Sequence, residues 1–154
     1  MLKAEFNEKP RQPYRLRLLA GAAYGLPDFR DRGYGMDIAK VGVVGAGQMG
    51  NGIAHVFALA GYDVLMTDVS KDALDQARQI ISGNLDRQVA REKITAAEKD
   101  EAMARIATTL VLKDLGQCDM IIEAATERET VKTAIFEDLV PHLKPETILT
   151  SNTS

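Results

Sequence analysis

Three glycines at the spacing Gly-x-Gly-x-x-Gly are the residues whose types and positions most clearly indicate chemistry. They stand in the run Gly45-Ala46-Gly47-Gln48-Met49-Gly50, directly after the apolar run 39–44. The first glycine permits a tight turn after a strand, the second leaves the backbone open to a pyrophosphate, and the third lets the next helix pack close to the sheet. The N-terminal N–H groups of that helix then face the phosphates. The run therefore predicts a phosphate-binding turn.

An acidic residue follows at the distance that a dinucleotide site requires. Asp68 ends the second apolar run, 63–67, and lies 18 residues after Gly50. A carboxylate there can accept hydrogen bonds from both hydroxyls of an adenine ribose, and it repels the additional phosphate of NADP. The order strand, glycine turn, helix, strand and acid supports the motif, so NAD is the predicted cofactor. A glycine turn that binds no ligand is the alternative.

The composition is that of an ordinary globular protein. The 154 residues are 45% hydrophobic and 27% charged, with a net charge of −3, which suits one domain with a real core. The acidic balance argues against nucleic acid as a partner. No apolar stretch approaches the roughly 20 residues that cross a bilayer, so no membrane association is expected. The single cysteine, Cys118, suits a reducing cytoplasm and is expected to be a buried or half-buried bystander. No metal site is predicted.

The first 36 residues differ from the rest of the sequence. Residues 1–35 hold seven Lys or Arg against four acids, with three of the five prolines and no sustained periodicity. We predict that Met36 is the natural start of the domain and that residues 1–36 are a poorly ordered extension or an over-long gene assignment. A targeting peptide is the alternative, although acidic residues weaken it.

From residue 37 onward the pattern alternates between strand and helix. This alternation predicts an α/β fold, a doubly wound parallel sheet of the Rossmann type. Strands are expected at 39–44, 63–67, 108–112, 120–124 and 147–150. Helices are expected at 51–60, from an N-cap at Ser70 to about 89, from a capping box at Thr95 to about 106, and over 131–143.

The connection after Asp68 is unusually long. About 40 residues separate this acid from the next expected strand, and they contain two helices where a plain crossover needs one. We expect this pair to project from the sheet as an inserted helical hairpin carrying Arg87, Arg91 and Lys93. These charges form either a solvated face or a clamp for an anionic group.

Four segments together resemble the 3-hydroxyacyl-CoA dehydrogenase family, in particular its 3-hydroxybutyryl-CoA dehydrogenases. They are GAGQMG at 45–50, the helical hairpin, IIEAATE at 121–127 and TSNTS at 150–154. The resemblance covers residues 37–154, the NAD-binding domain. It implies a cytoplasmic oxidoreductase of fatty-acid β-oxidation or butanoate metabolism. Such an enzyme converts (S)-3-hydroxyacyl-CoA, with a short acyl chain, to 3-oxoacyl-CoA by hydride transfer to NAD.

The resemblance also assigns roles to residues near the reacting end of the cofactor. It implies that Glu127 and Lys132 lie near the nicotinamide-side ribose, with Lys132 also reaching the acyl-CoA. It implies that Asn152 lies near the nicotinamide and that Ser154 contacts the 3-oxygen of the substrate. The residues alone leave simpler interpretations open, namely a surface ion pair for Glu127 and Lys132 and turn chemistry for the last four residues.

The same resemblance points to acyl-CoA contacts on the hairpin and to parts that lie beyond Ser154. The hairpin contacts fall near Asn84 and Arg91, neither of which matches the Ser and Lys of some members. The family's catalytic histidine, its glutamate and the helical domain that makes the homodimer all lie further along. Neither His55 nor His142 is expected to replace that histidine. We therefore expect a fragment of the NAD-binding domain that binds NAD weakly and turns over little or nothing.

Two alternatives remain at this point. The first is another hydroxy-acid dehydrogenase with the same glycine motif, such as a 3-hydroxyisobutyrate type, which the helical hairpin and the SNTS segment disfavour. The second is a non-catalytic module that senses the NADH to NAD ratio for a partner protein.

Overall fold

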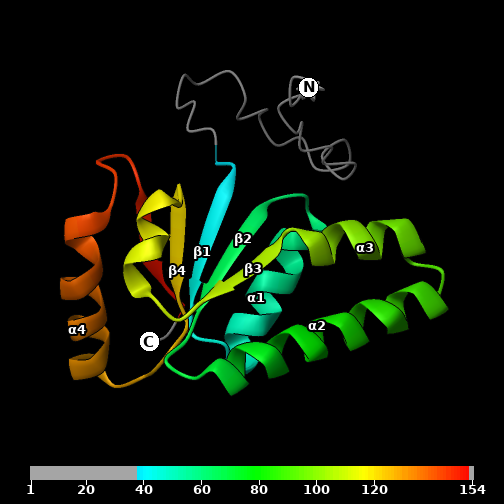
Figure 1. Ribbon diagram of the computed structural model, residues 1–154, viewed down its shortest axis with the longest axis horizontal. Helices are drawn as coiled ribbons and strands as arrows, with labels where there is room; N and C mark the ends of the chain where they lie inside the picture. The colour runs from blue at the N-terminus through cyan, green and yellow to red at the C-terminus, as the bar shows by residue number, and fades with distance from the viewer. Residues whose placement is uncertain (1–37, 153–154) are drawn as a thin grey trace, which may run out of the picture. The chain divides into compact units, whose positions relative to one another are not determined.

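The computed structural model describes residues 38–152, which form a five-stranded, wholly parallel sheet flanked by helices (Figure 1). The strand order is β3-β2-β1-β4-β5. The expected boundary at Met36, the extension before it and Ser154 lie outside the described residues. The elements, in chain order, are β1 (Lys40–Val44), α1 (Gln48–Leu59), β2 (Asp63–Thr67), α2 (Lys71–Ala90), α3 (Ala96–Ala104), β3 (Ile106–Thr109), the 3-10 helix η3 (Leu112–Gln117), β4 (Met120–Glu123), α4 (Glu129–Leu139), the 3-10 helix η4 (Val140–His142) and β5 (Ile148–Ser151).

This strand order confirms the predicted doubly wound α/β fold. The chain moves outward from β1 through β2 to β3, then returns to the other side of β1 to build β4 and β5. The direction of winding therefore reverses between β1 and β4. In open parallel sheets the crevice outside the carboxyl ends of the strands at such a reversal is where ligands bind. The glycine turn, which follows β1, lies at this point.

Alternating residues of the strands supply two separate cores, one on each face of the sheet. Val41 and Val43 pack into the core on the side of α1, α2 and α3, and Val44 packs into the core on the side of η3 and α4 (Figure 1). Cys118 belongs to the second core and is wholly buried, which confirms the predicted burial. A Cβ on Gly42 would stand 3.0–3.2 Å from side chains of that second core, so close packing accounts for this glycine.

The helical hairpin is present and projects from the sheet (Figure 1). The predicted N-cap of α2 is confirmed, because the Ser70 hydroxyl accepts a hydrogen bond from the Ala73 N–H at 3.2 Å. The predicted capping box at the start of α3 is complete: the Thr95 hydroxyl accepts from the Glu98 N–H, and the Glu98 carboxylate accepts from the Thr95 N–H. An ion pair between Lys99 of α3 and Asp86 of α2 joins the two helices.

Three expected elements had the wrong bounds. The helix expected to reach about residue 106 ends at Ala104, and the strand expected at 108–112 is β3, two to three residues earlier. The reason is long-range pairing, because β3 aligns Ile106 with Val64 of β2 and so buries Ile106 in the first core. The helix expected over 131–143 begins at Glu129 and ends at Leu139. A 3-10 turn containing Pro141 follows, since proline has no N–H with which to continue an α-helix.

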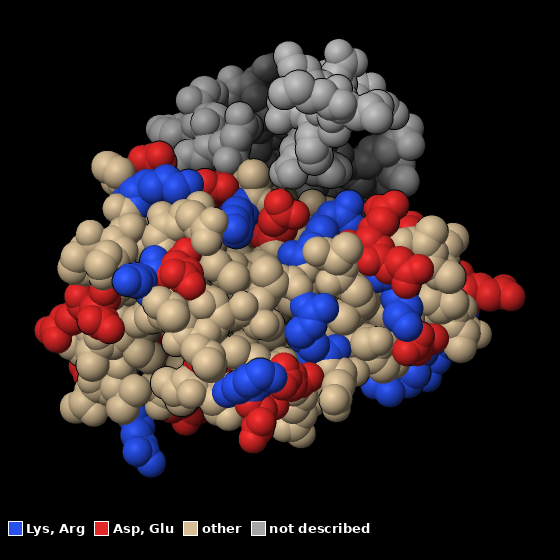
Figure 2. All heavy atoms as spheres, viewed as in Figure 1, with Lys and Arg blue, Asp and Glu red and all other residues tan. Residues whose placement is uncertain are grey.

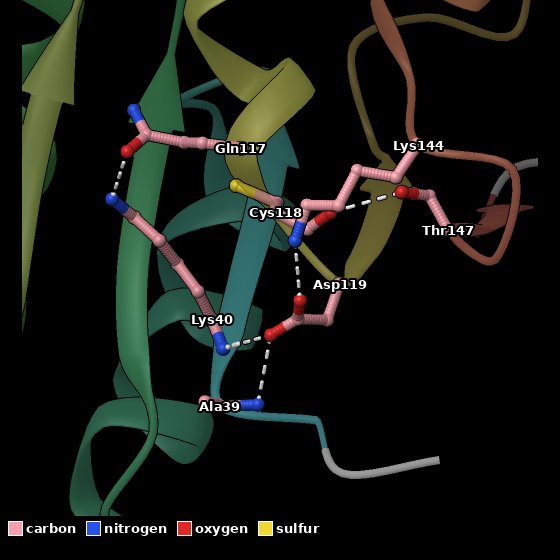
Figure 3. Close-up of polar contacts among 7 residues, drawn as sticks. All are labelled: Ala39, Lys40, Gln117, Cys118, Asp119, Lys144 and Thr147. Carbon is pink, nitrogen blue, oxygen red and sulfur yellow. Dashed lines mark hydrogen bonds and ion pairs between the residues drawn. The ribbon is translucent and has the colours of Figure 1, made fainter.

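A carboxylate joins the starts of three strands at the amino edge of the sheet (Figure 3). One oxygen of Asp119 accepts hydrogen bonds from the N–H groups of Ala39 and Lys40, both at 2.9 Å. Its other oxygen accepts from the ammonium of Lys144 at 2.7 Å. Asp119 lies just before β4 and Lys144 before β5, so this group connects both strands to β1.

The charged side chains on the face seen in Figure 2 are mixed in sign. Lysine and arginine side chains are interspersed there with aspartate and glutamate side chains. Within residues 38–152, no helix combines the length and the apolar composition that a bilayer crossing requires. The expectation that nucleic acid is not a partner stays a prediction.

Candidate functional site

The glycine turn adopts a geometry that side chains would prevent at two of its three glycines. Gly45 has a φ of +101°, a conformation that favours glycine, and a Cβ there would stand 2.7 Å from the carbonyl oxygen of Ala124. A Cβ on Gly50 would stand 1.8 Å from the carbonyl oxygen of Gly45. Gly45 therefore permits the turn, and Gly50 lets α1 pack against this turn. These are the roles that the spacing of the glycines predicts.

Gly47 differs from the other two, because a Cβ on it would meet no atom within 4 Å. It is the N-cap of α1, and its backbone is extended with a φ of −66°, which any residue can adopt. Gly47, Gln48 and Met49 are all exposed. The first N–H groups of a helix have no partner within the helix, and they carry its positive dipole end. The open space at Gly47 therefore fits an anion such as a pyrophosphate.

Asp68 lies beside this turn. Its Oδ2 atom accepts a hydrogen bond from the Ala46 N–H at 2.9 Å, and its Oδ1 atom accepts from the Ser70 N–H at 3.0 Å. A carboxylate offers about four lone-pair directions, so two remain after these bonds. The side chain is half-buried at the end of β2. The carboxylate can thus hold the glycine turn and still accept two hydroxyl hydrogen bonds from a ribose.

The predicted nicotinamide-side residues follow the carboxyl ends of β4 and β5. Glu127 is exposed in the segment between β4 and α4, and Lys132 is half-buried near the start of α4. Asn152 directly follows β5, and its N–H donates to the carbonyl oxygen of Glu123 at 2.8 Å. Because all strands are parallel, the chain brings these residues to the edge that carries the glycine turn.

Sequence reasoning missed one residue at this edge. Glu123 ends β4 and is wholly buried, and its carboxylate accepts hydrogen bonds from the N–H groups of Ala125 and Thr126 and from the Ser151 hydroxyl. The available signal was an acid at the end of an otherwise apolar strand, Met120–Glu123.

A groove of about 340 Å³ adjoins the glycine turn along one side of α1. It is mostly apolar, and Asn152 lies at it together with residues of α1 and β4. Its lining residues are Gln48, Met49, Gly52, Ile53, Val56, Phe57, Ile122 and Asn152. The groove therefore connects the helix start of the candidate phosphate site with the predicted nicotinamide side.

The two predicted acyl-CoA residues on the hairpin lie away from the glycine turn. Asn84 is 13 residues beyond the start of α2 at Lys71, which corresponds to about 20 Å along the helix. Arg91 is the C-cap of α2 and is exposed, and it lies seven residues after Asn84, which places both toward one side of the helix. The Asn84 side-chain oxygen accepts a hydrogen bond from Arg87. Their role toward acyl-CoA stays a prediction.

Neither histidine has the surroundings of a catalytic base. His55 is buried within α1, where burial lowers the pKa of its imidazole, and its Nε2 lies 3.1 Å from the Gln88 amide nitrogen of α2. This polar contact joins α1 to α2. His142 is exposed in η4, just before β5 begins, and so lies toward the opposite edge of the sheet from the glycine turn. Among the residues that the structure describes, no cluster of His, Cys, Asp and Glu is arranged to hold a metal ion.

Comparison with known proteins gives one consistent result. The profile of the family described as 3-hydroxyacyl-CoA dehydrogenase, NAD binding domain, matches residues 40–154. A 3-hydroxybutyryl-CoA dehydrogenase of Bradyrhizobium diazoefficiens is 54% identical over 117 residues, covering 76% of this chain and 40% of that protein. A 3-hydroxyadipyl-CoA dehydrogenase of Escherichia coli is 40% identical over 119 residues, covering 77% of this chain and 25% of that protein.

Solved structures agree with these sequence relatives. The crystal structure of (S)-3-hydroxybutyryl-CoA dehydrogenase from Ralstonia eutropha superimposes with a TM-score of 0.74 and 41% identity, over 76% of this chain and 41% of that one. The glycine turn, the adjacent acid and the parallel sheet fit NAD, the cofactor that this family's domain binds. The chain therefore belongs to the 3-hydroxyacyl-CoA dehydrogenase family, as its NAD-binding domain.

Proposed function

We propose that the whole protein oxidises short-chain (S)-3-hydroxyacyl-CoA to 3-oxoacyl-CoA with NAD, within fatty-acid or butanoate metabolism, and that this chain binds the NAD. The chain spans 40% of the length of its Bradyrhizobium relative, so the activity of the whole protein is inferred from relatives. The single observation that carries the NAD assignment is the hydrogen bond from Ala46 to Asp68, because it holds an acid beside an open glycine turn.

The adenosine half of the cofactor is bound by the first β-α-β unit. The pyrophosphate accepts hydrogen bonds from the N–H groups at the start of α1. These groups belong to the segment 45–50, which includes Gly45, Gly47, Gln48, Met49 and Gly50. The two remaining lone-pair directions of Asp68 accept the ribose hydroxyls. A phosphate on that ribose would meet the negative charge of Asp68, so NAD is favoured over NADP.

The nicotinamide half lies toward the ends of β4 and β5. Glu127 accepts hydrogen bonds from the second ribose, and the ammonium of Lys132 reaches the same ribose and the acyl-CoA. Asn152 orients the nicotinamide amide at the groove beside α1, and Ser154 contacts the 3-oxygen of the substrate. When bound, NAD accepts the hydride from carbon 3, while the hydroxyl proton passes to a base that residues 38–152 do not supply.

The acyl-CoA runs from the nicotinamide side toward the hairpin, where Arg91 meets its anionic groups and Asn84 contributes a hydrogen bond. The whole protein is a cytoplasmic homodimer whose dimer contact lies in its other domain. These assignments rest on the resemblance of the chain to its family.

Binding and turnover test different parts of the proposal. The 154-residue chain, titrated with NADH and NADPH by calorimetry, should bind NADH saturably and NADPH at least about tenfold more weakly, because one charge repulsion is worth about 1.4 kcal/mol or more at short range. Folded chain that binds no NADH, or prefers NADPH, would overturn the cofactor assignment. The same chain should show no oxidation of (S)-3-hydroxybutyryl-CoA, whereas protein from the full reading frame should oxidise the (S) and not the (R) isomer.

A further inference from the structure

A buried carboxylate joins the two segments that lead to the predicted nicotinamide side. Glu123 has no exposed surface. Its Oε1 accepts hydrogen bonds from the N–H groups of Ala125 and Thr126 at 2.7 and 3.2 Å. Its Oε2 accepts from the Ser151 hydroxyl at 2.7 Å. Its backbone carbonyl oxygen accepts from the Asn152 N–H at 2.8 Å. One residue thus receives hydrogen bonds from the end of β5 and from the segment after β4.

A carboxylate is a costly choice at this place if only packing matters. Burying a charge away from water is unfavourable unless hydrogen bonds compensate it, and an apolar side chain would fill the same space without that cost. The two oxygens do what an apolar side chain cannot do. They hold the turn at 125–126 and the Ser151 side chain at the same time, and charge-assisted hydrogen bonds of this kind are short and directional.

The two segments so joined are those that carry Glu127 and Asn152. Glu127 follows Thr126 directly, and Asn152 follows Ser151 directly. We propose that Glu123 is a positioning residue, which through Ser151 and the 125–126 turn sets the geometry of the nicotinamide half of the NAD site. Being wholly buried, Glu123 itself does not touch the cofactor. This inference rests on the proposed NAD site and goes beyond it, because it predicts that the two halves of the cofactor respond differently to one substitution.

The same two strands offer a matched control at their other ends. The Thr147 hydroxyl, just before β5, donates a hydrogen bond to the carbonyl oxygen of Cys118, just before β4, at 3.0 Å (Figure 3). This bond also links the β4 and β5 segments through a hydroxyl. It lies at the amino edge of the sheet, away from the glycine turn. Thr147→Val therefore removes a similar link with no effect expected on either half of the site.

The experiment compares NADH with ADP as ligands of the 154-residue chain. ADP has the adenosine and pyrophosphate but no nicotinamide riboside, so its affinity reports the β1, α1 and β2 part of the site and an intact fold. Ser151→Ala removes the hydroxyl that donates to the carboxylate, and Glu123→Gln replaces one acceptor oxygen by an NH2 group, which cannot accept. Each should therefore weaken NADH binding by about tenfold and leave ADP affinity within about twofold. Thr147→Val should change neither.

A double-mutant cycle separates positioning from direct contact. If Ser151 acts through Glu123, the double variant Ser151→Ala with Glu123→Gln should bind NADH about as weakly as the weaker single variant. Losses that multiply would mean that Ser151 contacts the cofactor on its own, and the proposal would be overturned. In a variant that still binds ADP, equal losses for NADH and ADP would overturn it as well, and so would the absence of any loss in either single variant.

Amide hydrogen exchange supplies a readout that does not need the cofactor. Ser151→Ala should speed exchange at Ala125 and Thr126, because the carboxylate that holds their N–H groups loses its own anchor, while Thr147→Val should not. If Glu123→Gln fails to bind ADP, it has not folded, and exchange and binding in Ser151→Ala then decide the question. Wild-type chain that binds ADP and not NADH would refute the proposed NAD site itself, which is a different result from any of these.

Discussion

The Oδ2 atom of Asp68 accepts a hydrogen bond from the backbone N–H of Ala46 at 2.9 Å, although 22 residues separate them. Ala46 is the second residue of the glycine turn, and Asp68 follows β2. The bond therefore joins the end of the second strand to the turn after the first strand. Both ends of this bond lie at the proposed cofactor site. The same carboxylate has a structural role and a predicted binding role.

This double role makes Asp68→Asn informative. An amide keeps one acceptor oxygen but loses the charge and half of the acceptor capacity, so NADH affinity should fall by about tenfold or more. NADPH affinity should rise relative to NADH, because the repelling charge is gone. Calorimetric titration with both coenzymes checks this. Asp72→Asn, an exposed acid in the first turn of α2, is the control and should leave both affinities unchanged. Unaltered NADH affinity in Asp68→Asn would mean that Asp68 does not contact the cofactor.

Alanine in the glycine turn should lower coenzyme affinity at Gly47 and conformational stability at Gly50. Gly47→Ala adds a methyl group in open space at the N-cap of α1, where alanine is less favourable than glycine, so the free energy of unfolding should fall by no more than about 1 kcal/mol while NADH affinity falls at least about tenfold. Gly50→Ala places a methyl group 1.8 Å from the Gly45 carbonyl oxygen, so the turn cannot keep its shape and stability should drop by more than about 2 kcal/mol. Urea unfolding and NADH titration measure the two effects.

Gly83→Ala is the control for this pair. A Cβ on Gly83 would meet only the Arg87 side chain, at 4.0 Å, and this glycine lies inside α2, away from the glycine turn. Alanine there should stabilise the chain by about 0.5–1 kcal/mol through helix propensity. Gly47→Ala binding NADH as tightly as the wild type would show that no pyrophosphate approaches that backbone.

Stability should depend on pH through Asp119. Burial raises the pKa of this carboxyl, but the hydrogen bonds from Lys144 and from the Ala39 and Lys40 N–H groups outweigh burial and hold the pKa below its ordinary value of 3.8. A group whose pKa is lower in the folded state stabilises the fold above its unfolded pKa, and this stabilisation is lost as the pH falls through the folded pKa. It should therefore be complete at neutral pH and decline below about pH 4.

The variant Asp119→Asn checks this. At pH 7 it should lower the free energy of unfolding by about 2 kcal/mol, because several charge-assisted hydrogen bonds weaken at once. At pH 3 the difference from the wild type should be much smaller. Urea unfolding at both values measures it, with Asp100→Asn, an exposed acid of α3, as the control. A difference that grows toward acid would mean that the sign of the pKa shift is wrong.

Cys118 should be inert in the folded chain. Burial raises the pKa of its thiol to about 11, and the thiolate is the reactive form. At pH 8, iodoacetamide should therefore label the native chain far more slowly than it labels glutathione, and it should label the chain fully in guanidinium chloride, as mass spectrometry would show. Labelling of the native chain at the rate of glutathione would mean that the core between η3 and α4 opens readily.

Features that depend on neighbours in the chain were predictable. The turn at Gly45, the cap at Ser70 and the box at Thr95 each follow from a few adjacent residues whose backbone and hydrogen-bond preferences are local. Asp68 was identifiable because its distance from the glycines is set by one helix and one strand. The alternation of strands and helices then implied a parallel sheet. A parallel sheet in turn implied that Glu127 and Asn152 lie at its carboxyl edge.

Other features depended on contacts between distant segments, and only the folded structure decided them. The start of β3 at Ile106 follows from its register with Val64, which an apolar run in the sequence does not reveal. In the sequence, only its place at the end of an apolar run distinguishes Glu123 from other acidic residues. Its partner Ser151 is 28 residues further along, and only the pairing of β5 with β4 brings the Ser151 hydroxyl to the Glu123 carboxylate. Local sequence carries backbone preference and spacing, whereas burial and hydrogen-bond partners across a sheet arise only when the strands pair.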